Sequence, residues 1–538
     1  MIYKAFSMAN LPIIQALIAL VAFLVCYQFF RKPYRNLPPG PKGIPFIGNI
    51  FDLPPKGTIE FEHWLKHKNL YGPISSLTIF GNTMIFIHGR HAIYELMEKQ
   101  SVMSSGRPLL EFLTYCGFGK FMVMHQLQDH EFKTHRKGMH SLIGTKSLVA
   151  KFAHSQEVEA RRLLLRILKE PNNIMGHLKI EVTAVILKSV YGYTVDPQED
   201  DPLVTLIERT AADFEAASIP FNQTIDIVPV FKYLPQGFPG TGFKKTAQRY
   251  ARNIRDTVNI PFGFVRQQIT KGNNYPSYVS KLVEQSCADS DVDKLNADNE
   301  DMIKWSAAIM YLGGSETLTV QLSSFLVAMM LFPEVHRKAQ EEIDRVTSGT
   351  RLPLLSDREA MPYMGAVVSE VLRWHPVAPL AVPHVADEEL TYNGYTIPKG
   401  AVLFGSIWWL AHDPEVYQDP DSFVPERFLE PRNEQDPRTW MYGFGRRVCP
   451  GRYLAESVMF LTFTHILATC IISKARDNEG REIVPKLEPN PGMTCHISAF
   501  PYEITPRSKR HTELIQNIEQ EHPWEQSDSI YLEGLEEK

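Results

Sequence analysis

The chain has 538 residues, of which 44% are hydrophobic and 22% are charged, as in globular proteins with a substantial core. Its formal net charge of -5 argues against a nucleic-acid-binding protein, and its hydrophobic share argues against a multi-span membrane protein. Six cysteines lie far apart without a C-x-x-C pair, which disfavours a disulfide scaffold or zinc module and favours a reducing compartment.

The N-terminal segment predicts a membrane anchor. Residues 11–30 carry no charge and are long enough to cross a bilayer as a helix. Arg31, Lys32 and Arg35 follow, whereas only Lys4 precedes, so the positive-inside rule places residues 1–10 in the lumen and the rest in the cytosol. A cleaved signal peptide is the alternative, but its apolar region is usually shorter and ends in small residues.

The next segments predict a hinge and then a small sheet. Residues 31–46 are rich in proline, which forbids a helix and favours an extended, semi-rigid spacer. Residues 74–80 and 83–88 read as two strands joined at Gly81-Asn82, a hairpin signal. From about residue 90 to 375 the pattern is mainly helical.

Within that helical part, residues 147–169 and 244–270 read as helices, and Pro261 should end or kink the second. Four prolines should break residues 218–240 into loops. We find no internal repeat.

The C-terminal part predicts short strands at residues 391–397 and 401–406 and a last helix at residues 453–470. Residues 507–538 form an acidic tail with few apolar residues, and we expect this tail to be disordered.

Residues 442–451, with the sequence YGFGRRVCPG, hold the most informative cysteine. Their glycines permit a tight curl around a sulfur, with N–H groups aimed at it. Pro450 suits the first position of a helix, which predicts Cys449 at a helix N-terminus, where the macrodipole favours the thiolate. Arg447 adds a fixed cation that can bind a carboxylate through two hydrogen bonds. An isolated cysteine is more often a buried structural residue, so the surrounding motif favours the ligand role.

This segment resembles the cysteine-ligand loop of the cytochrome P-450 family, whose pattern is aromatic-Gly-x-Gly-x-Arg-x-Cys-x-Gly. The one departure is at the first, aromatic position. The family usually has Phe there, whereas this chain has Tyr442, whose hydroxyl needs a partner. The resemblance implies a mainly α fold with a smaller β-rich region, a catalytic domain at residues 47–506, and haem b with Cys449 as the axial thiolate ligand to the iron. It also implies that Arg447 and Phe444 contact the cofactor.

Two further motifs, Glu370-Val-Leu-Arg373 and Pro-Glu-Arg427-Phe, occur in the family's order. A Glu and an Arg three residues apart share a helix face and can pair, although most such pairs are solvated surface pairs. By resemblance, Glu370, Arg373 and Arg427 form a buried structural triad that supports the cysteine loop.

Residues 313–317, with the sequence GGSET, lie inside the helix expected from about residue 301 to 332. Each glycine within a helix costs about 1 kcal/mol relative to Ala, which a groove beside the iron would justify. The matching family motif implies that Glu316 and Thr317 relay protons for O–O cleavage. Helix flexibility or close helix packing is the alternative.

The resemblance also assigns Arg136 and His384 to the haem propionates. Many family members have Trp four residues before that arginine, whereas Phe132 here removes an indole donor. A lone histidine is more often structural, so the assignment of His384 rests on its family position.

By resemblance, the protein is a monooxygenase that inserts one atom of O2 into a substrate, usually at a C–H bond, with electrons from NADPH. The chain has no dinucleotide-binding motif, so we expect a separate NADPH-cytochrome reductase as partner, with cytochrome b5 as a second candidate. Lys133, Lys137 and Arg446 are candidate docking cations or ordinary surface charges. The expected location is the endoplasmic reticulum membrane, single-pass, with a cytosolic catalytic domain.

The expected substrate is a lipophilic or aromatic small molecule. The sequence around the motifs, at residues 378–384 and 395–400, resembles fungal members of specialised metabolism. Family position gives five mostly apolar wall segments of the substrate pocket: residues 104–125, 218–240, 310–313, 377–382 and 493–496.

Two other functions fit parts of the sequence. One is a haem-thiolate isomerase or dehydratase that acts without O2, although such members commonly lose the acid–Thr pair that Glu316 and Thr317 retain. The other is a non-catalytic haem- or lipid-binding membrane protein, which needs no proton relay. Asn222 begins a glycosylation sequon that should stay unused in the cytosol.

Overall fold

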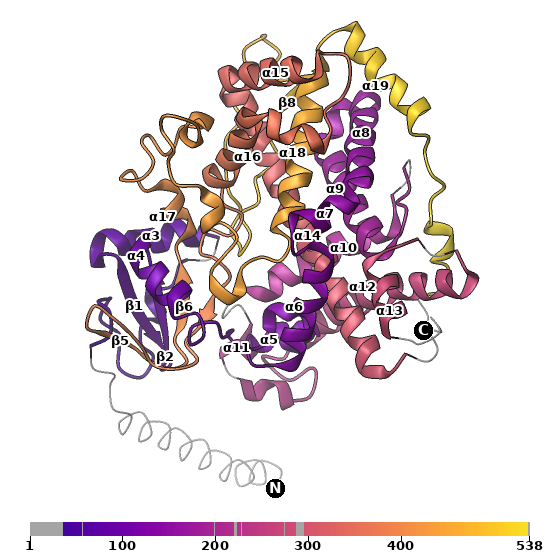
Figure 1. Ribbon diagram of the computed structural model, residues 1–538. Coiled ribbons are helices and arrows are strands. Elements are labelled where there is room, and N and C mark those ends of the chain that lie inside the picture. The colour runs from indigo at the N-terminus through magenta and orange to yellow at the C-terminus, as the bar shows by residue number, and fades with distance from the viewer. Residues whose placement is uncertain are drawn as a thin grey trace.

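The computed structural model describes residues 36–55, 57–197, 200–219, 223–227, 229–273, 275–286 and 295–535. The predicted anchor at residues 11–30 and the sequon residue Asn222 lie outside them. Figure 1 shows a large helical body with a small β-rich region at one end. The fold is therefore mainly α, as predicted.

The helices are α3 (Glu60–Tyr71), α4 (Arg90–Ile93), α5 (Glu111–Tyr115), α6 (His130–Ile143), α7 (Lys146–Val149), α8 (Ala153–Lys169), α9 (Ile174–Tyr191), α10 (Pro202–Ser218), α11 (Thr224–Ile227), α12 (Phe243–Lys271), α13 (Tyr278–Ser286), α14 (Ala297–Leu331), α15 (Pro333–Thr347), α16 (Pro362–Trp374), α17 (Ile407–His412), α18 (Arg452–Thr469) and α19 (Lys509–Glu521). The strands are β1 (Ile74–Ile79), β2 (Asn82–Ile87), β3 (His384–Val385), β4 (Leu390–Tyr392), β5 (Tyr395–Ile397), β6 (Val402–Gly405), β7 (Cys470–Lys474) and β8 (Tyr502–Pro506).

The longest helix, α14, passes through the middle of the helical body (Figure 1). It packs against α9, α10, α12, α16 and α18. Its residues from Ile303 to Met330 are apolar on every side of the helix and mostly buried, as expected of a helix surrounded by others. Among the described residues no single helix could span a membrane; α14 and α15 reach the required length and hydropathy only as a pair, bent by 107°.

The main sheet has the strand order β1-β2-β6-β3. Strands β1 and β2 form the predicted hairpin, with Ile79 opposite Asn82, so the turn lies one residue earlier than expected. Strand β6 runs parallel to β2, and β3 pairs with β6 so that His384 faces Leu403. This pairing fixes a candidate site residue to the sheet.

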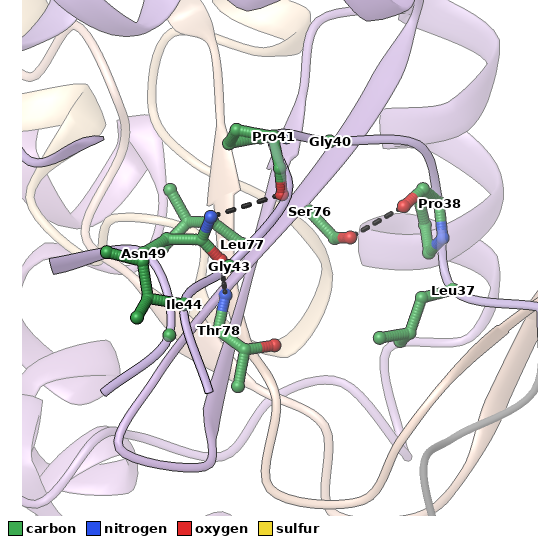
Figure 2. A pocket seen from close by; sticks show the side chains of 11 residues that line it. Leu37, Pro38, Gly40, Pro41, Gly43, Ile44, Asn49, Ser76, Leu77 and Thr78 are labelled. Atoms are coloured by element: carbon green, nitrogen blue, oxygen red, sulfur yellow. Dashed lines mark hydrogen bonds between the residues drawn. The ribbon is translucent and has the colours of Figure 1, made fainter. Parts of the chain in front are cut away.

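The described part of the proline-rich segment is attached to β1. Ser76 donates from Oγ to the carbonyl of Pro38 over 2.6 Å, and Asn49 bridges Pro41 and the amide of Thr78 (Figure 2). A cavity of about 300 Å³ lies between this segment and the strand. A Cβ on Gly40 would lie 1.8 Å from the carbonyl oxygen of Ser76, so only glycine permits this approach. Residues 37–43 form no helix or strand, residues 45–47 form a turn, and the segment is held against the sheet.

Three predicted elements differ in detail. The strand expected at residues 391–397 is a hairpin, β4–β5, because Asn393 and Gly394 take positive φ angles of 47° and 79° and form a tight turn. Pro261 lies inside α12, which continues to Lys271 rather than ending there. Residues 146–149 form the separate helix α7, and α8 begins at Ala153.

The prediction of a disordered tail is wrong for residues 509–535. Helix α19 packs along α8 with Ile515 and Ile518 buried, and the two helices lie side by side in Figure 1. Beyond it, the Trp524 ring lies 5.3 Å from the guanidinium carbons of Arg162 and Arg166. The acidic residues that suggested disorder meet basic partners here, because Glu525 pairs with Lys188 over 2.7 Å and with Arg162 over 3.4 Å.

Candidate active site

The loop before α18 curls back on itself around Cys449. The amide of Cys449 donates to the carbonyl of Tyr442 over 2.7 Å, which closes the loop. Gly445 has a φ of +51°, and a Cβ there would lie 2.4 Å from Cβ of Ser101, so glycine is required. Phe444 is buried against the β-rich region, which fixes the loop to the sheet side of the molecule.

The surroundings of the Cys449 thiol act on its pKa in both directions. Burial raises its pKa, whereas hydrogen bonds from the amides of Gly451 and Arg452 and the charge of Arg136 oppose that shift. The net shift is upward. Helix α18 begins at Arg452, so Pro450 is not its first residue; the predicted helix N-terminus lies three residues beyond the sulfur. The thiol still keeps exposed surface, unlike the other three described cysteines, so it borders a space inside the protein.

Buried basic side chains gather beside this loop. Arg447 donates from Nε to the carbonyl of Ser105 over 2.8 Å and from a terminal nitrogen to the carbonyl of His125 over 2.7 Å. Burial lowers its pKa to about 10. His384 is 2% exposed, its Nδ1 lies 2.8 Å from the carbonyl of Ser104, and burial together with Arg107 holds its pKa well below the usual range.

Arg107 belongs to this group, although the sequence analysis missed it. It donates to the carbonyls of Val382 and Pro383 over 2.9 and 2.6 Å. Burial, and then the charge of Arg447, hold its pKa well below the usual range. The sequence places this arginine between Gly106 and Pro108 in a predicted wall segment of the pocket. The neighbouring residues do not indicate that its side chain points into the protein.

Arg136 on α6 completes the group from the other side. It donates to the carbonyl of Val448 over 2.7 Å and acts electrostatically on Cys449 and Arg447. Phe132, one turn earlier, places its ring 4.2 Å from the guanidinium carbon of Arg447. The ring thus supports that cation by a cation–π contact, a role the sequence analysis did not foresee.

None of these three arginines has an ion-pair partner within 4 Å among the described residues. Burying a charge without a counter-charge is costly, so the arrangement suits an anionic group. The site therefore offers one accessible sulfur beside several unpaired cations. It is suited to a cofactor that carries both a metal and carboxylates.

The two glycines of α14 have different surroundings. A Cβ on Gly314 would lie 2.7 Å from Cδ1 of Ile186 on α9, so this glycine permits close helix packing. A Cβ on Gly313 would meet nothing within 4 Å, and this residue is exposed in the middle of a buried helix. Close helix packing therefore explains Gly314, whereas Gly313 borders open space and its predicted role in a groove stays a prediction.

Glu316 and Thr317 lie beside that opening; within the described part of the chain, no hydrogen bond or ion pair joins them to the residues around Cys449. Thr317 donates from Oγ1 to the carbonyl of Gly313 over 2.7 Å. Burial raises the pKa of Glu316; Lys179 and His496 oppose this shift, and Glu208 and Glu215 add to it. The acid and the hydroxyl are therefore adjacent in the chain; the hydroxyl is bonded to the carbonyl of Gly313, and the acid lies among other charged side chains.

Glu370, Arg373 and Arg427 are in contact, as predicted, and fully buried. Glu370 accepts from Nε of Arg373 over 2.7 Å and from Nε of Arg427 over 3.2 Å. The same carboxylate accepts from the amide of Val424 over 2.7 Å. The other guanidinium donors go to backbone carbonyls and, from Arg427, also to the carboxylate of Glu434 over 3.3 Å.

Two predicted wall segments also meet. The amide of Cys495 donates to the carbonyl of Val377 over 2.7 Å. Aromatic side chains from three further elements pack together: Phe118 and Phe121 contact Phe214 on α10, and Phe121 also contacts Trp305 on α14. These contacts bring segments far apart in the sequence to one region beside α14.

Comparison with known proteins gives a single result. The profile of the cytochrome P450 family matches residues 38–496. Cytochrome P450 monooxygenase CLM2 of Gibberella zeae is 43% identical over 520 residues, 96% of this chain and 98% of that protein. Multifunctional cytochrome P450 monooxygenase af510 of Aspergillus fumigatus is 41% identical, over 94% and 95%. The O-methylsterigmatocystin oxidoreductase of Aspergillus flavus is 37% identical, over 92% of each chain.

Proposed function

Because the chain belongs to the cytochrome P450 family, whose members are monooxygenases that use haem b with a cysteine thiolate ligand, we propose that it hydroxylates or otherwise oxidises a lipophilic small molecule. O2 is the oxidant, and electrons come from NADPH through a separate reductase. We place the enzyme in fungal specialised metabolism, since relatives include the O-methylsterigmatocystin oxidoreductase.

The combination of one accessible cysteine with unpaired buried cations carries this proposal. Cys449 would ligate the iron, and Arg107, Arg136, Arg447 and His384 would bind the two propionates of haem b. Phe444, buried against the β-rich region, would hold the loop in place for the cofactor. When bound, the haem supplies the oxygen-activating chemistry, which a thiolate ligand favours. Since burial alone raises the pKa of Cys449, metal binding and deprotonation of the thiol are coupled.

Glu316 and Thr317 are the proton-handling residues. A raised pKa keeps more of Glu316 protonated than an ordinary glutamate at neutral pH, so it can give a proton. The Thr317 hydroxyl donates to Gly313 but retains oxygen lone pairs that can accept. Together they hold and pass the protons that reduction of O2 consumes, and Gly313 leaves room beside them.

The remaining parts of the proposal concern location and partners. Residues 11–30 anchor the enzyme in the endoplasmic reticulum membrane, and the proline-rich segment, held against β1, sets the orientation of the cytosolic domain. The reductase is the expected NADPH-cytochrome reductase, with cytochrome b5 as an additional donor. The aromatic cluster around Phe121 and Phe214 favours an aromatic or otherwise lipophilic substrate.

The first test is the visible spectrum of the purified protein, reduced and exposed to carbon monoxide. The proposal expects the strongly red-shifted Soret band of a thiolate-ligated haem, and Cys449→Ser should lose it, whereas Cys470→Ser should keep it. A second test is turnover with a reductase: oxidation that needs NADPH and O2 supports a monooxygenase. Conversion of a substrate without either would contradict the proposed reaction and indicate an isomerase.

A further inference from the structure

A polar cluster of three side chains lies where α10 meets the loop before β8. Thr494 donates from Oγ1 to Glu215 over 2.9 Å. Nε2 of His496 lies 3.1 Å from that hydroxyl and 3.5 Å from the other oxygen of Glu215. A Cβ on Gly492 would lie 2.4 Å from the same carboxylate, so the loop backbone is shaped around Glu215.

This cluster borders the reaction region rather than the outer surface alone. Both Glu215 and His496 act electrostatically on Glu316, the acid beside Thr317. Phe214 packs into the aromatic cluster, and the residue before His496 is hydrogen-bonded to Val377. The side chains of Glu215 and His496 are each 28% exposed, so they remain accessible to a bound molecule.

The hydrogen bonds leave one nitrogen of His496 free. Thr494 has a single hydroxyl proton, which it gives to Glu215, so Nε2 of His496 must donate to the Thr494 oxygen. In the neutral ring the other nitrogen, Nδ1, is then an acceptor. Within the described part of the chain, Nδ1 has no hydrogen-bond partner.

The charges around the cluster are mostly negative. Glu208 pairs with Lys179 over 3.2 Å, which neutralises both. Of the described groups that act on Glu316, Glu215 is then the acid without an ion-pair partner other than His496. A carboxylate on the substrate would meet like charges here, whereas a neutral hydroxyl would find an acceptor.

Resting on the function proposed above, we propose that Glu215, Thr494 and His496 form a substrate anchor. His496 accepts a hydrogen bond from a hydroxyl of an otherwise lipophilic substrate, and Glu215 orients His496 and repels carboxylates. The preferred substrate class is therefore a phenol or alcohol rather than an acid. Glu215 and Thr494 are positioning residues in this arrangement.

The experiment uses the full-length holoenzyme and three phenylimidazoles, whose imidazole binds the haem iron and shifts its absorbance. They carry a para-hydroxyl, a para-methyl or a para-carboxylate group, so they differ only in the group offered to the anchor. Titration of the absorbance shift gives three dissociation constants for each variant. The ratio of the methyl to the hydroxyl constant cancels general effects on haem and fold.

We expect His496→Phe to lower that ratio about fivefold, the value of one neutral hydrogen bond. Glu215→Gln, which has nearly the same shape, should strengthen binding of the carboxylate compound about threefold while changing the methyl compound little. His511→Phe, in the tail, is the matched control and should change neither quantity.

The outcomes separate the two proposals. The anchor would be overturned, and the monooxygenase assignment left intact, by either of two results with normal carbon monoxide spectra. One is a methyl-to-hydroxyl ratio that His496→Phe leaves unchanged, and the other is carboxylate binding that Glu215→Gln leaves unchanged. A protein that binds no haem, or whose haem takes up none of the three imidazoles, would contradict the proposed function itself. Tighter binding of the carboxylate compound than of the hydroxyl compound by the wild type would also overturn the anchor.

Discussion

Two buried arginine clusters in this molecule are completed in different ways. Arg373 and Arg427 are fully buried, and both bind the carboxylate of Glu370. Arg107 and Arg447 are buried as well, but the described residues give them only backbone carbonyls and no ion pair. The charge of Arg447 also helps to lower the pKa of Arg107.

The difference separates a structural role from a binding role. A buried cation that already has its acid holds elements together, here α16 and the segment around Phe428. A buried cation without an acid destabilises the protein until an anion arrives. We therefore expect mutations in the first cluster to affect folding and mutations in the second to affect cofactor binding.

The largest effect should follow from breaking the completed cluster. Glu370→Gln leaves buried Arg373 without an acid and Arg427 with Glu434 alone, so it should reduce the free energy of unfolding by about 3–5 kcal/mol. Chemical unfolding measures this loss. Glu334→Gln is the control, because Glu334 and Arg337 have the same spacing but are 76% and 55% exposed. Its effect should stay below about 1 kcal/mol, and equal losses would refute the contrast.

A buried acid in the core offers a pH test of the same idea. Burial raises the pKa of Glu181 to about 8 from its usual 4.5, and one of its oxygens lacks a partner. Between these values the folded state holds a proton that the unfolded chain has lost, so stability should fall as pH rises, by at most about 1.4 kcal/mol per unit. Glu181→Gln should flatten this decline in chemical unfolding, whereas Glu513→Gln on exposed α19 should not.

The incomplete cluster should respond in its cofactor affinity. Arg107→Gln removes the charge but keeps an amide donor for the carbonyls of Val382 and Pro383. Haem should transfer to an acceptor apoprotein about tenfold more readily, since a charge-assisted bond is worth about 1.5–3 kcal/mol. The apoprotein should unfold within about 1 kcal/mol of the wild type. Arg351→Gln, whose ion pair with Asp357 is on the surface, is the control.

The smallest effect should come from Tyr442, beside the cysteine. Its hydroxyl is buried without a partner among the described residues, so Tyr442→Phe should be neutral or raise stability by about 1 kcal/mol. Tyr417→Phe is the matched comparison, because that buried hydroxyl donates to the carbonyl of Gln435 over 2.7 Å and its loss should destabilise. Thermal melting should show a lower midpoint for Tyr417→Phe but not for Tyr442→Phe, and a destabilised Tyr442→Phe would contradict the prediction.

Sequence reasoning went furthest where the chemistry is local. The ten residues around Cys449 predicted a tight loop before a helix, since glycine and proline restrict the backbone whatever surrounds them. The single strand predicted at residues 391–397 was wrong, although Asn393-Gly394 is a strong hairpin signal. The pair Glu370–Arg373 could not be told from Glu334–Arg337 by spacing alone; the family motif, rather than the pattern, distinguished them.

The tail was misjudged for a related reason. Its acidic composition resembles that of disordered segments, but composition does not reveal partners elsewhere in the chain. Arg162, Arg166 and Lys188 lie more than 300 residues before Trp524 and Glu525. Only when α8 and α9 place those cations on one surface do the tail's ring and carboxylates have something to bind.

By itself the sequence determined the family, the cysteine loop and the order of the motifs, because each depends on residues close together in the chain. The tertiary structure decided which charges are paired. It turned Arg107 inward, gave Gly313 open space and Gly314 a neighbouring helix, and brought His496 to Glu215. The physical reason is that burial and pairing are properties of two surfaces at once, and the chain brings those surfaces together only on folding.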